Sequence, residues 1–313
     1  MIVTCTPNPS LDRTIEIDEL LRGEVQRMRS VSVQPGGKGI NVARALHANG
    51  HDVRAIAPLG GAEGELFARL VQHAGVPFTP VEVDQAIRVN ITLAEADGTT
   101  TKLNDRGPTL DEAPRRRLLD ATLDAAVGAR WLAACGSLPP GAGDDLYADL
   151  VTRARAADRR VAVDTSGPAL AAVIDAGPDL IKPNHHELAE LVGDELKTFG
   201  DVVDAARRVI DRGVVSVLIS LGGDGALLVT GDAVWFGESE PVAVRSTVGA
   251  GDSLLAGFLA AGGDGPESLT TGIAWATAAV SLPGSTMPSP DDLALDATHV
   301  GDTFDPDRPL EGD

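Results

Sequence analysis

Short, mostly apolar runs alternate with longer amphipathic stretches along almost the whole chain, and this alternation restricts the fold more than any other feature. Such runs are typical of strands that are buried on both faces of a sheet. They fall at residues 2–5, 53–57, 131–135, 161–164, 180–182, 214–221 and 226–230. The stretches between them have helical periodicity and cover residues 39–48, 63–74, 111–127, 145–158, 199–212 and 251–261. This order predicts a doubly wound α/β core, with a mostly parallel sheet and helices on both of its faces.

Two segments, residues 12–35 and 87–104, break this rhythm because polar and apolar residues alternate within them. The second contains Asp97-Gly98 between two alternating runs, which is a strong hairpin signal. We expect both segments to form a small β-sheet lid, half exposed, over the core. The core then comprises residues 1–11, 36–86 and 105–297. Residues 298–313 are rich in Asp, Pro and Gly and are expected to be a frayed tail.

The net charge excludes several classes of partner. With 46 acidic and 26 basic residues among 313, the chain has a formal charge of −20, which disfavours binding to nucleic acid or to anionic membranes. No run approaches the roughly 18 apolar residues of a membrane span, and the first residues lack the features of a secretion signal, so a cytoplasmic location is expected. Cys5 and Cys135 each lie in an apolar run and are interpreted as small buried hydrophobic residues.

Residues 34–44 contain the first glycine-rich stretch, Gln-Pro-Gly-Gly-Lys-Gly-Ile-Asn-Val-Ala-Arg. Gly36 and Gly37 would let the backbone approach a ligand closely, and the helix that follows offers its positive N-terminus. Lys38 and Asn41 fall in the first turn of that helix. The glycine spacing fits neither a Walker A loop nor a dinucleotide fingerprint. A ligand-binding loop is favoured here over a plain turn that enters a helix.

A second glycine-rich stretch, residues 246–253, also leads into a predicted helix. Gly249, Ala250 and Gly251 can direct several free backbone N–H groups at one point, which would stabilise developing negative charge. Asp252 follows them, where it is well placed to take a proton from a hydroxyl group. An ordinary helix cap is the alternative interpretation of Asp252, and this stretch alone does not decide between the two.

Three more loops follow predicted strands, at the edge where open parallel sheets bind ligands. Residues 220–225 form a glycine-rich turn. Asn184 and Glu187, three residues apart at a helix start, could share a hydrated Mg²⁺ or simply cap that helix. The adjacent histidines between them point apart on a helix, so a zinc site is disfavoured. Ser137 lacks the pattern of a nucleophile elbow and is interpreted as a hydrogen-bond partner for a polar ligand or part of a rigid turn.

Taken together and in this order, these stretches resemble the PfkB (ribokinase-like) family of carbohydrate kinases over nearly the whole chain. The early Gly-Gly-Lys-Gly-Ile-Asn resembles the family's sugar loop. The late Thr-Val-Gly-Ala-Gly-Asp-Ser resembles its anion hole and catalytic aspartate. The branch of the family that phosphorylates phosphorylated ketohexoses is similar at Thr-Pro-Asn-Pro-Ser-Leu-Asp (6–12), Arg-Gly-Glu-Val (22–25), Arg-Val-Asn (88–90) and Gly-Ser-Leu-Pro-Pro-Gly (136–141).

The resemblance implies a role for each of these residues. Asp252 would be the general base for a sugar hydroxyl that attacks the γ-phosphate of ATP, and the N–H groups of Gly249, Ala250 and Gly251 would hold the charge on the transferred group. Mg²⁺ would accompany ATP, organised through water by Asn184 and Glu187. The nucleotide would contact Lys182, Asn184, Ser220, Gly222, Gly223, Gly225, Thr247 and Val248. The sugar would contact Asp12, Gly36, Gly37, Lys38, Asn41, Asn90 and Ser137. The lid of the family often pairs two subunits, which implies a homodimer through the small sheet.

Basic residues are expected near the substrate, because ATP and a sugar phosphate are both anions. Several basic residues fall on or beside the predicted lid and sugar loop, namely Arg27, Arg29, Lys38, Arg88 and Arg106. We interpret them as ligands for the phosphate of an already phosphorylated sugar. The alternative is that they are solvated charges that protect the edge strands from aggregation. The expected reaction is the ATP-dependent phosphorylation of D-fructose 1-phosphate to D-fructose 1,6-bisphosphate. The nearest alternatives are kinases of tagatose 6-phosphate or fructose 6-phosphate. A sugar-phosphate sensor without catalysis is the alternative from another class.

Overall fold

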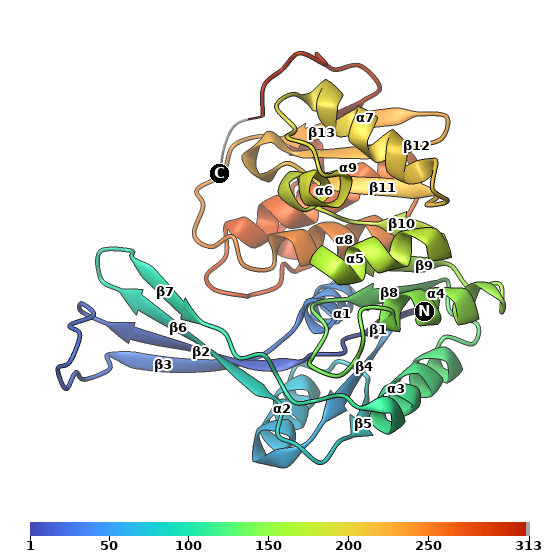
Figure 1. Cartoon of the computed structure of the whole chain (residues 1–313). Helices are drawn as coiled ribbons and strands as arrows, with labels where there is room; N and C mark the ends of the chain where they lie inside the picture. The colour runs from blue at the N-terminus through green and yellow to red at the C-terminus, as the bar shows by residue number, and fades with distance from the viewer. Residues whose placement is uncertain (311–313) are drawn as a thin grey trace.

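The computed structural model describes residues 1–310 and contains a ten-stranded sheet and a separate four-stranded sheet (Figure 1). The strands of the large sheet are, in spatial order, β14 (Thr298–Gly301), β13 (Val234–Ser239), β12 (Ala226–Thr230), β11 (Ser216–Ser220), β10 (Leu180–Ile181), β9 (Val161–Asp164), β8 (Trp131–Cys135), β1 (Ile2–Cys5), β4 (Val53–Leu59) and β5 (Phe78–Glu82). Neighbouring strands from β11 to β5 are parallel. Those from β11 to β14 are antiparallel. The sheet is therefore mostly parallel, as predicted.

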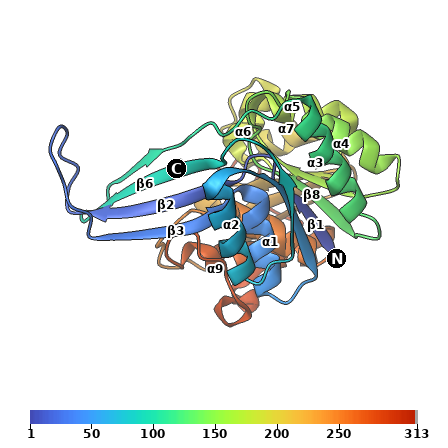
Figure 2. The ribbon, with the colours of Figure 1, turned by 90° about the horizontal axis from the view of Figure 1, so that it is seen from below.

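Helices cover both faces of the large sheet (Figure 2), which confirms the doubly wound fold. One face packs against α3 (Glu112–Ala125), α4 (Leu146–Arg155), α5 (Gly167–Val173), α6 (His185–Val192) and α7 (Phe199–Ile210). The other packs against α1 (Lys38–Ala48), α2 (Gly61–His73), α8 (Ala250–Ala260) and α9 (Gly265–Val280). Short 3₁₀ turns lie at η1 (Ile174–Ala176), η2 (Gly222–Asp224), η3 (Pro290–Asp292) and η4 (Leu295–Ala297).

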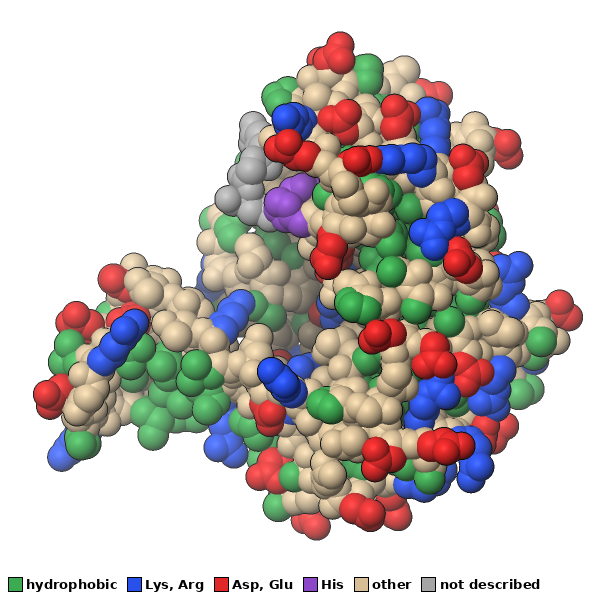
Figure 3. Space-filling model, in the orientation of Figure 1, with side chains coloured by type: hydrophobic (Ala, Val, Ile, Leu, Met, Phe, Trp, Pro, Cys, Tyr) green, Lys and Arg blue, Asp and Glu red, His purple; other side chains and the backbone are tan. Residues whose placement is uncertain are grey.

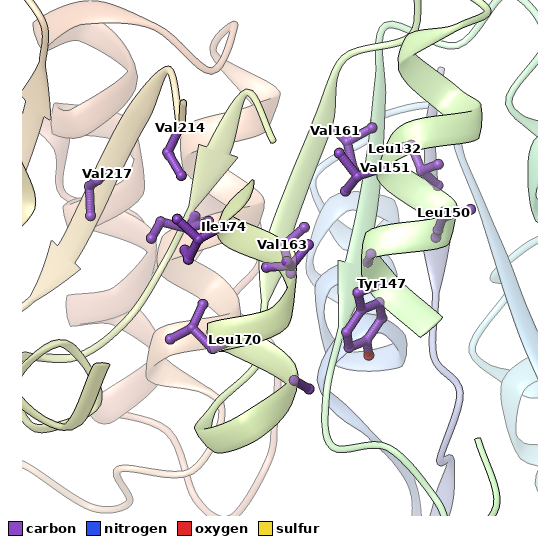
Figure 4. Close-up of a cluster of buried hydrophobic side chains, with 14 of the residues drawn as sticks. Leu132, Tyr147, Leu150, Val151, Val161, Val163, Leu170, Ile174, Val214 and Val217 are labelled. Carbon is purple, nitrogen blue, oxygen red and sulfur yellow. The ribbon is translucent and has the colours of Figure 1, made fainter. Parts of the chain in front are cut away.

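Two clusters of apolar side chains fill the space between the sheet and these helices. Figure 4 shows part of one of them, where Leu150 and Val151 of α4 lie with Leu132 of β8 and Val161 of β9. Burying a side chain of this size contributes about 1.5–3 kcal/mol relative to leaving it exposed. Tyr147 is buried in the same cluster, and its hydroxyl donates a hydrogen bond of 2.8 Å to the Gly136 carbonyl. The core thus fixes the strand ends from which the loops of the site emerge.

The small sheet consists of β3 (Ser30–Gly36), β2 (Ser10–Ile17), β6 (Arg88–Glu95) and β7 (Thr100–Leu103), and it projects away from the core (Figure 1). As predicted, β6 and β7 form a hairpin around Asp97-Gly98. The register places Asp12, Gln34 and Asn90 on one face of the sheet and the apolar residues on the other. Gln34 of the polar face contacts Ser285 of the core, while Leu11, Val33 and Val89 of the apolar face pack against the core cluster that includes side chains of α1 and α2. The small sheet therefore meets the core on both faces at its inner end.

The prediction of a frayed C-terminal tail is wrong for residues 298–310. Residues 298–301 form β14 at the edge of the large sheet, and Phe304 stacks in a cluster with Phe199 and Phe236. These contacts join residues that lie far apart in the sequence, so local composition gives no sign of them. Residues 311–313 lie outside the described part of the chain.

Two further expectations concern the cysteines and membrane-spanning helices. Cys5 and Cys135 are both free and buried, as expected of small hydrophobic residues. Among the helices of residues 1–310, none combines the length and the apolar character that crossing a bilayer requires.

Candidate active site

A pocket of about 290 Å³ lies where the carboxyl ends of β9, β10 and β11 meet the first turns of α1, α6 and α8. Open α/β sheets bind their ligands at this edge. The pocket is lined by Lys38, Asp164, Lys182, Asn184, Glu187, Ser220, Gly249, Gly251 and Asp252. Eight of these nine residues are predicted site residues, and Asp164 is the exception. A larger hollow of about 560 Å³ beside α7 contains none of them, so the smaller pocket is the candidate site.

Asp252 lies in the first turn of α8 and is 7% exposed. The side-chain amide of Asn41, in the first turns of α1, donates a hydrogen bond of 2.8 Å to its Oδ2. Burial raises the pKa of Asp252 to about 6, and the negative charge of Asp164 acts in the same direction. The hydrogen bond from Asn41 and the charges of the two pocket lysines oppose this rise. A carboxylate with this pKa is ionised at neutral pH and can still accept a proton.

The backbone at the start of α8 presents free donors to the same pocket. Gly249 has φ +83°, a left-handed conformation that favours glycine, and its carbonyl accepts the N–H of Ser253 at 2.8 Å. Within residues 1–310, the N–H groups of Gly251 and Asp252 have no hydrogen-bond acceptor. The structure differs from the prediction at Ala250, whose N–H is directed at the carbonyl of Thr247 at 3.4 Å because this turn closes on itself. Among the described residues, the free backbone donors of this turn are therefore those of Gly249, Gly251 and Asp252.

Asp164 is the pocket residue that sequence reasoning missed. It is fully buried, and its carboxylate lies 2.7 Å from Nζ of Lys38 and 3.1 Å from Nζ of Lys182. Burial acts to raise the pKa of Asp164, but the charge of Lys182 and then that of Lys38 outweigh burial and hold this pKa below its ordinary value. Burial likewise acts against the charged form of Lys38, yet the pKa of this lysine is raised because Asp164 lies so close. The signal in the sequence was an aspartate that ends an otherwise apolar strand at the ligand-binding edge.

The polar face of the small sheet meets the core beside this pocket. Asp12 accepts hydrogen bonds from Ser10 at 2.8 Å and from the amide of Asn90 at 2.9 Å. Gly36 lies against the same carboxylate, since a Cβ atom there would be 2.0 Å from Oδ2 of Asp12. Burial lowers the pKa of Arg88, which Asp12 and Asp105 partly counteract. Three of the predicted sugar contacts, Asp12, Asn90 and Arg88, are therefore neighbours.

The remaining sugar-side predictions lie on the loops around α1 and after β8. Gly37 is the N-cap of α1 at φ +112°, again a conformation that favours glycine. Ser137 accepts a hydrogen bond of 3.4 Å from the side-chain amide of Asn8. The Asn41 amide has a second partner, because Arg44 donates to its Oδ1 at 3.4 Å. These contacts fix the positions of the loops around the start of α1 and after β8.

The predicted clustering of Arg27 and Arg29 with the sugar loop is wrong for a single chain. The register pairs Ser30 with Glu16, so these arginines lie at the outer end of the small sheet (Figure 1). That end is four residues along β2 from Asp12, or about 13 Å at the rise of a strand. Arg29 pairs instead with Asp18 at 3.4 Å. The physical reason is that β2 and β3 carry their connecting loop away from the core.

Four of the predicted nucleotide and metal residues line the pocket: Lys182, Asn184, Glu187 and Ser220. Asn184 and Glu187 form a capping box at α6, in which Oδ1 of Asn184 accepts the N–H of Glu187 and Oε2 of Glu187 accepts the N–H of Asn184. The cap that the sequence left as an alternative is thus present, and both side chains still line the pocket. Gly222, Gly223 and Gly225 form the turn that follows Ser220. Thr247 and Val248 are exposed on the approach to α8.

Comparison with known proteins identifies the family. A family model described as pfkB family carbohydrate kinase matches residues 6–292, a range that contains all nine pocket residues. The chain belongs to this family. As a PfkB kinase it is a phosphotransferase that acts on a hydroxyl group of a carbohydrate and uses ATP. The predicted family and the predicted enzyme class are both confirmed.

Several relatives of this kinase cover almost its whole length. It is 40% identical to 1-phosphofructokinase of Haloferax volcanii over 304 aligned residues. This alignment covers 96% of this chain and 97% of the Haloferax protein. It is 36% identical over 311 aligned residues to ATP-dependent 6-phosphofructokinase isozyme 2 of Mycobacterium tuberculosis, and this alignment covers 96% of this chain and 91% of the other. The crystal structure of phosphofructokinase-2 from Escherichia coli is similar with a TM-score of 0.88 and 36% identity, over 93% of this chain and 96% of that one.

Proposed function

We propose that this kinase transfers the γ-phosphoryl group of ATP to D-fructose 1-phosphate, which yields D-fructose 1,6-bisphosphate and ADP. The observation that carries the proposal is Asp252, a buried carboxylate with a pKa of about 6 that shares one pocket with free backbone N–H groups and two lysines. The choice of sugar is supported by the 1-phosphofructokinases among the relatives, which are 34–40% identical and include those of Haloferax volcanii and Bacillus subtilis.

Asp252 acts as the general base. It takes the proton of the free primary hydroxyl of the sugar as that oxygen attacks the γ-phosphorus, while the bond from this phosphorus to the β-phosphate oxygen breaks and ADP leaves. A positioned base contributes roughly 10²–10⁴-fold to the rate of such a step. The raised pKa suits this role, because the carboxylate is ionised at neutral pH but is more basic than an exposed one.

The charge on the transferred group is stabilised at the N-terminus of α8. The free N–H groups of Gly251 and Asp252 donate to its oxygens, and the positive end of the helix acts in the same direction. Lys38 and Lys182 supply the positive charge that an otherwise acidic chain needs at this point. Asp164 holds both ammonium groups at the pocket wall, so we assign it a positioning role.

The sugar phosphate lies between the pocket and the polar face of the small sheet. The side chains of Asp12 and Asn90 are hydrogen-bonded to each other there and can bind sugar hydroxyl groups. Arg88 lies beside them, 3.3 Å from the carbonyl of Asp105, and its guanidinium is suited to a phosphate because it presents several N–H donors in one plane. We assign Arg88 to the phosphate that the substrate already carries.

Mg²⁺ fits this pocket through water. Among residues 1–310, no group of three or more His, Cys, Asp or Glu side chains is arranged to hold a metal ion. Asn184 and Glu187 already use one oxygen each in the capping box, which leaves their other lone pairs for water. Mg²⁺ in kinases keeps several waters and binds mainly to the phosphates of the nucleotide, where it neutralises charge. These two residues would therefore orient the hydrated ion that ATP brings.

We also infer that two copies of this kinase pair through the small sheet. Its apolar face includes Ile15, Val31, Leu93 and Leu103, of which Val31 is 49% and Leu103 55% exposed. Figure 3 shows hydrophobic side chains gathered over this sheet, and a patch of this kind is typical of an interface. A tetrameric form is described for phosphofructokinase-2 from Escherichia coli, which is 36% identical.

Sedimentation of the purified chain tests the pairing. We expect a dimer or larger species, and we expect Val31→Glu to sediment as a monomer. Val127→Glu is the control, because Val127 is also an exposed valine (67%) and lies beyond the end of α3, outside the small sheet. A wild-type monomer at micromolar concentration would contradict the pairing.

The substitution Asp252→Asn tests the catalytic role. We expect kcat to fall by roughly 10²–10⁴-fold, while calorimetry shows the affinity for the sugar phosphate nearly unchanged. Asp232→Asn, at an exposed aspartate far from the pocket, should behave as the wild type. A wild-type chain that binds the sugar phosphate but does not turn over ATP would favour a sensor instead.

A further inference from the structure

The C-terminal segment, residues 304–310, is docked on the core by backbone and aromatic contacts. The N–H of Phe199 donates to the Arg308 carbonyl at 3.0 Å, and the N–H of Gly200 donates to the Pro306 carbonyl at 2.8 Å. The ring of Phe304 lies 6.4 Å from those of Phe199 and Phe236. The segment therefore has a defined position relative to α7 and β13.

The side chain of Arg308 connects this C-terminal segment to the glycine-rich turn that follows Ser220. Its guanidinium lies over the rings of Phe199 and Phe236, at 4.8 and 5.5 Å from their centres. One of its N–H groups donates to Oδ1 of Asp224 at 2.9 Å, and another donates to Glu238 at 3.2 Å. The side chain of Asp224 is 2% exposed and that of Arg308 is 35% exposed, so this charge-assisted bond is shielded from solvent on the Asp224 side.

Asp224 is the charged side chain of the turn that follows Ser220. Its neighbours Gly222 and Gly225 have φ values of +62° and +100°, and the turn is closed by a hydrogen bond of 2.9 Å between the N–H of Leu221 and the Gly225 carbonyl. The glycine residues of the turn add no side-chain contacts, so its position depends on its backbone bonds, on the buried side chain of Leu221 and on Asp224. Ser220, at the start of the turn, lines the pocket.

We propose that Arg308 is a positioning residue for nucleotide binding. It acts through Asp224 to hold the glycine-rich turn in the shape that accepts ATP, and so links the C-terminal end of the chain to the active site. This inference rests on the proposed function, in which the nucleotide contacts the turn. Loss of the Arg308–Asp224 bond weakens ATP binding and leaves the sugar side of the pocket, on the other side of Asp252, unaffected.

The substitution Arg308→Met tests this link, because methionine keeps the apolar contact with the two aromatic rings and removes both ion pairs. We expect the Kd for Mg·ATP from calorimetry, and the KM for ATP, to rise about tenfold, as the loss of one charge-assisted hydrogen bond allows. The KM for the sugar phosphate should stay within about twofold. Arg212→Met is the matched control, since Arg212 pairs with Asp175 at 2.8 Å on the surface and should leave both constants unchanged.

A double-mutant comparison shows whether Arg308 acts through Asp224. In a background of Asp224→Asn, the change Arg308→Met should add little to the rise in Kd. An unchanged Kd for Mg·ATP in Arg308→Met, with a lower melting temperature, would overturn the inference and leave Arg308 a purely structural residue. A wild-type chain that fails to bind Mg·ATP would overturn the proposed function as well, so the two failures are distinguishable.

Discussion

The hydrogen bond from Asn41 to Asp252 should set the pH range in which the enzyme works. Asn41→Leu replaces the amide by an apolar group of similar size and removes the donor 2.8 Å from Oδ2 of Asp252. This donor favours the ionised carboxylate and opposes the effect of burial. Without it, the pKa of Asp252 should rise above its value of about 6.

The size of the shift follows from the burial of the pair. A hydrogen bond to a charged group contributes about 1.5–3 kcal/mol, and about 1.4 kcal/mol corresponds to one pKa unit, so the rise should be about one to two units. Asp252 is 7% exposed and Asn41 6% exposed, so solvent screens little of this energy. The base must be ionised to act, so activity at pH 7 should fall by roughly two- to tenfold and return toward the wild-type level near pH 9.

The assay is the pH dependence of kcat/KM for the sugar phosphate, at saturating Mg·ATP, in the wild type and in Asn41→Leu. Titration of the substrate phosphate is common to both proteins and cancels in their ratio. Loss of a sugar contact by Asn41 would lower the whole profile, whereas the predicted effect moves its acidic limb to higher pH. A limb that stays in place, or moves to lower pH, would refute the assignment of this hydrogen bond to the base.

Three further predictions concern other parts of the pocket. Gly249→Ala forces a left-handed backbone on alanine and places Cβ 3.0 Å from Met287. It should therefore lower the free energy of unfolding, measured in urea, by about 1–2 kcal/mol and should also lower kcat. Unchanged kcat and stability would contradict this prediction. Asp164→Asn leaves two lysines near each other without a counter-ion and should cost about 3 kcal/mol at pH 7. Because the pKa of Asp164 is lowered on folding, its contribution is present above the unfolded pKa and is lost as the pH falls through the folded value, so wild type and variant should converge in acid; a constant difference would refute the ion pairing. Arg88→Ala should raise the KM for the sugar phosphate about tenfold or more and leave the KM for ATP unchanged; an unchanged KM for the sugar phosphate would remove Arg88 from the phosphate site.

The layered core could be predicted because most of its strands are short apolar runs, and the stretches between them have the periodicity of amphipathic helices. The strand at 78–82 was missed because it contains Pro80 and lies at an edge of the sheet, where apolar residues are fewer. The helix at 265–280 was missed because apolar residues lie around most of its circumference, so it shows little amphipathic periodicity. In both cases tertiary position, rather than local pattern, decides the element.

The site was predictable where glycines and polar residues stand at the start of a helix, as at Lys38, Asn184 and Asp252. Asp164 was missed because it is the last residue of a buried strand, and its role depends on two lysines that are brought to it by other elements. The outer position of Arg29 and the docking of Arg308 also follow from long-range pairing. The sequence indicates which residues are unusual, whereas the fold decides which of them meet.

The preference of this pocket for fructose 1-phosphate can be tested directly. The most direct measurement is initial-rate ADP release with Mg·ATP and each of fructose 1-phosphate, fructose 6-phosphate, tagatose 6-phosphate and free fructose. We expect kcat/KM for fructose 1-phosphate to exceed that for each of the others by about a hundredfold, or roughly 2.7 kcal/mol of transition-state discrimination. A greater kcat/KM for either 6-phosphate, or no turnover of any of the four sugars, would contradict the proposed function.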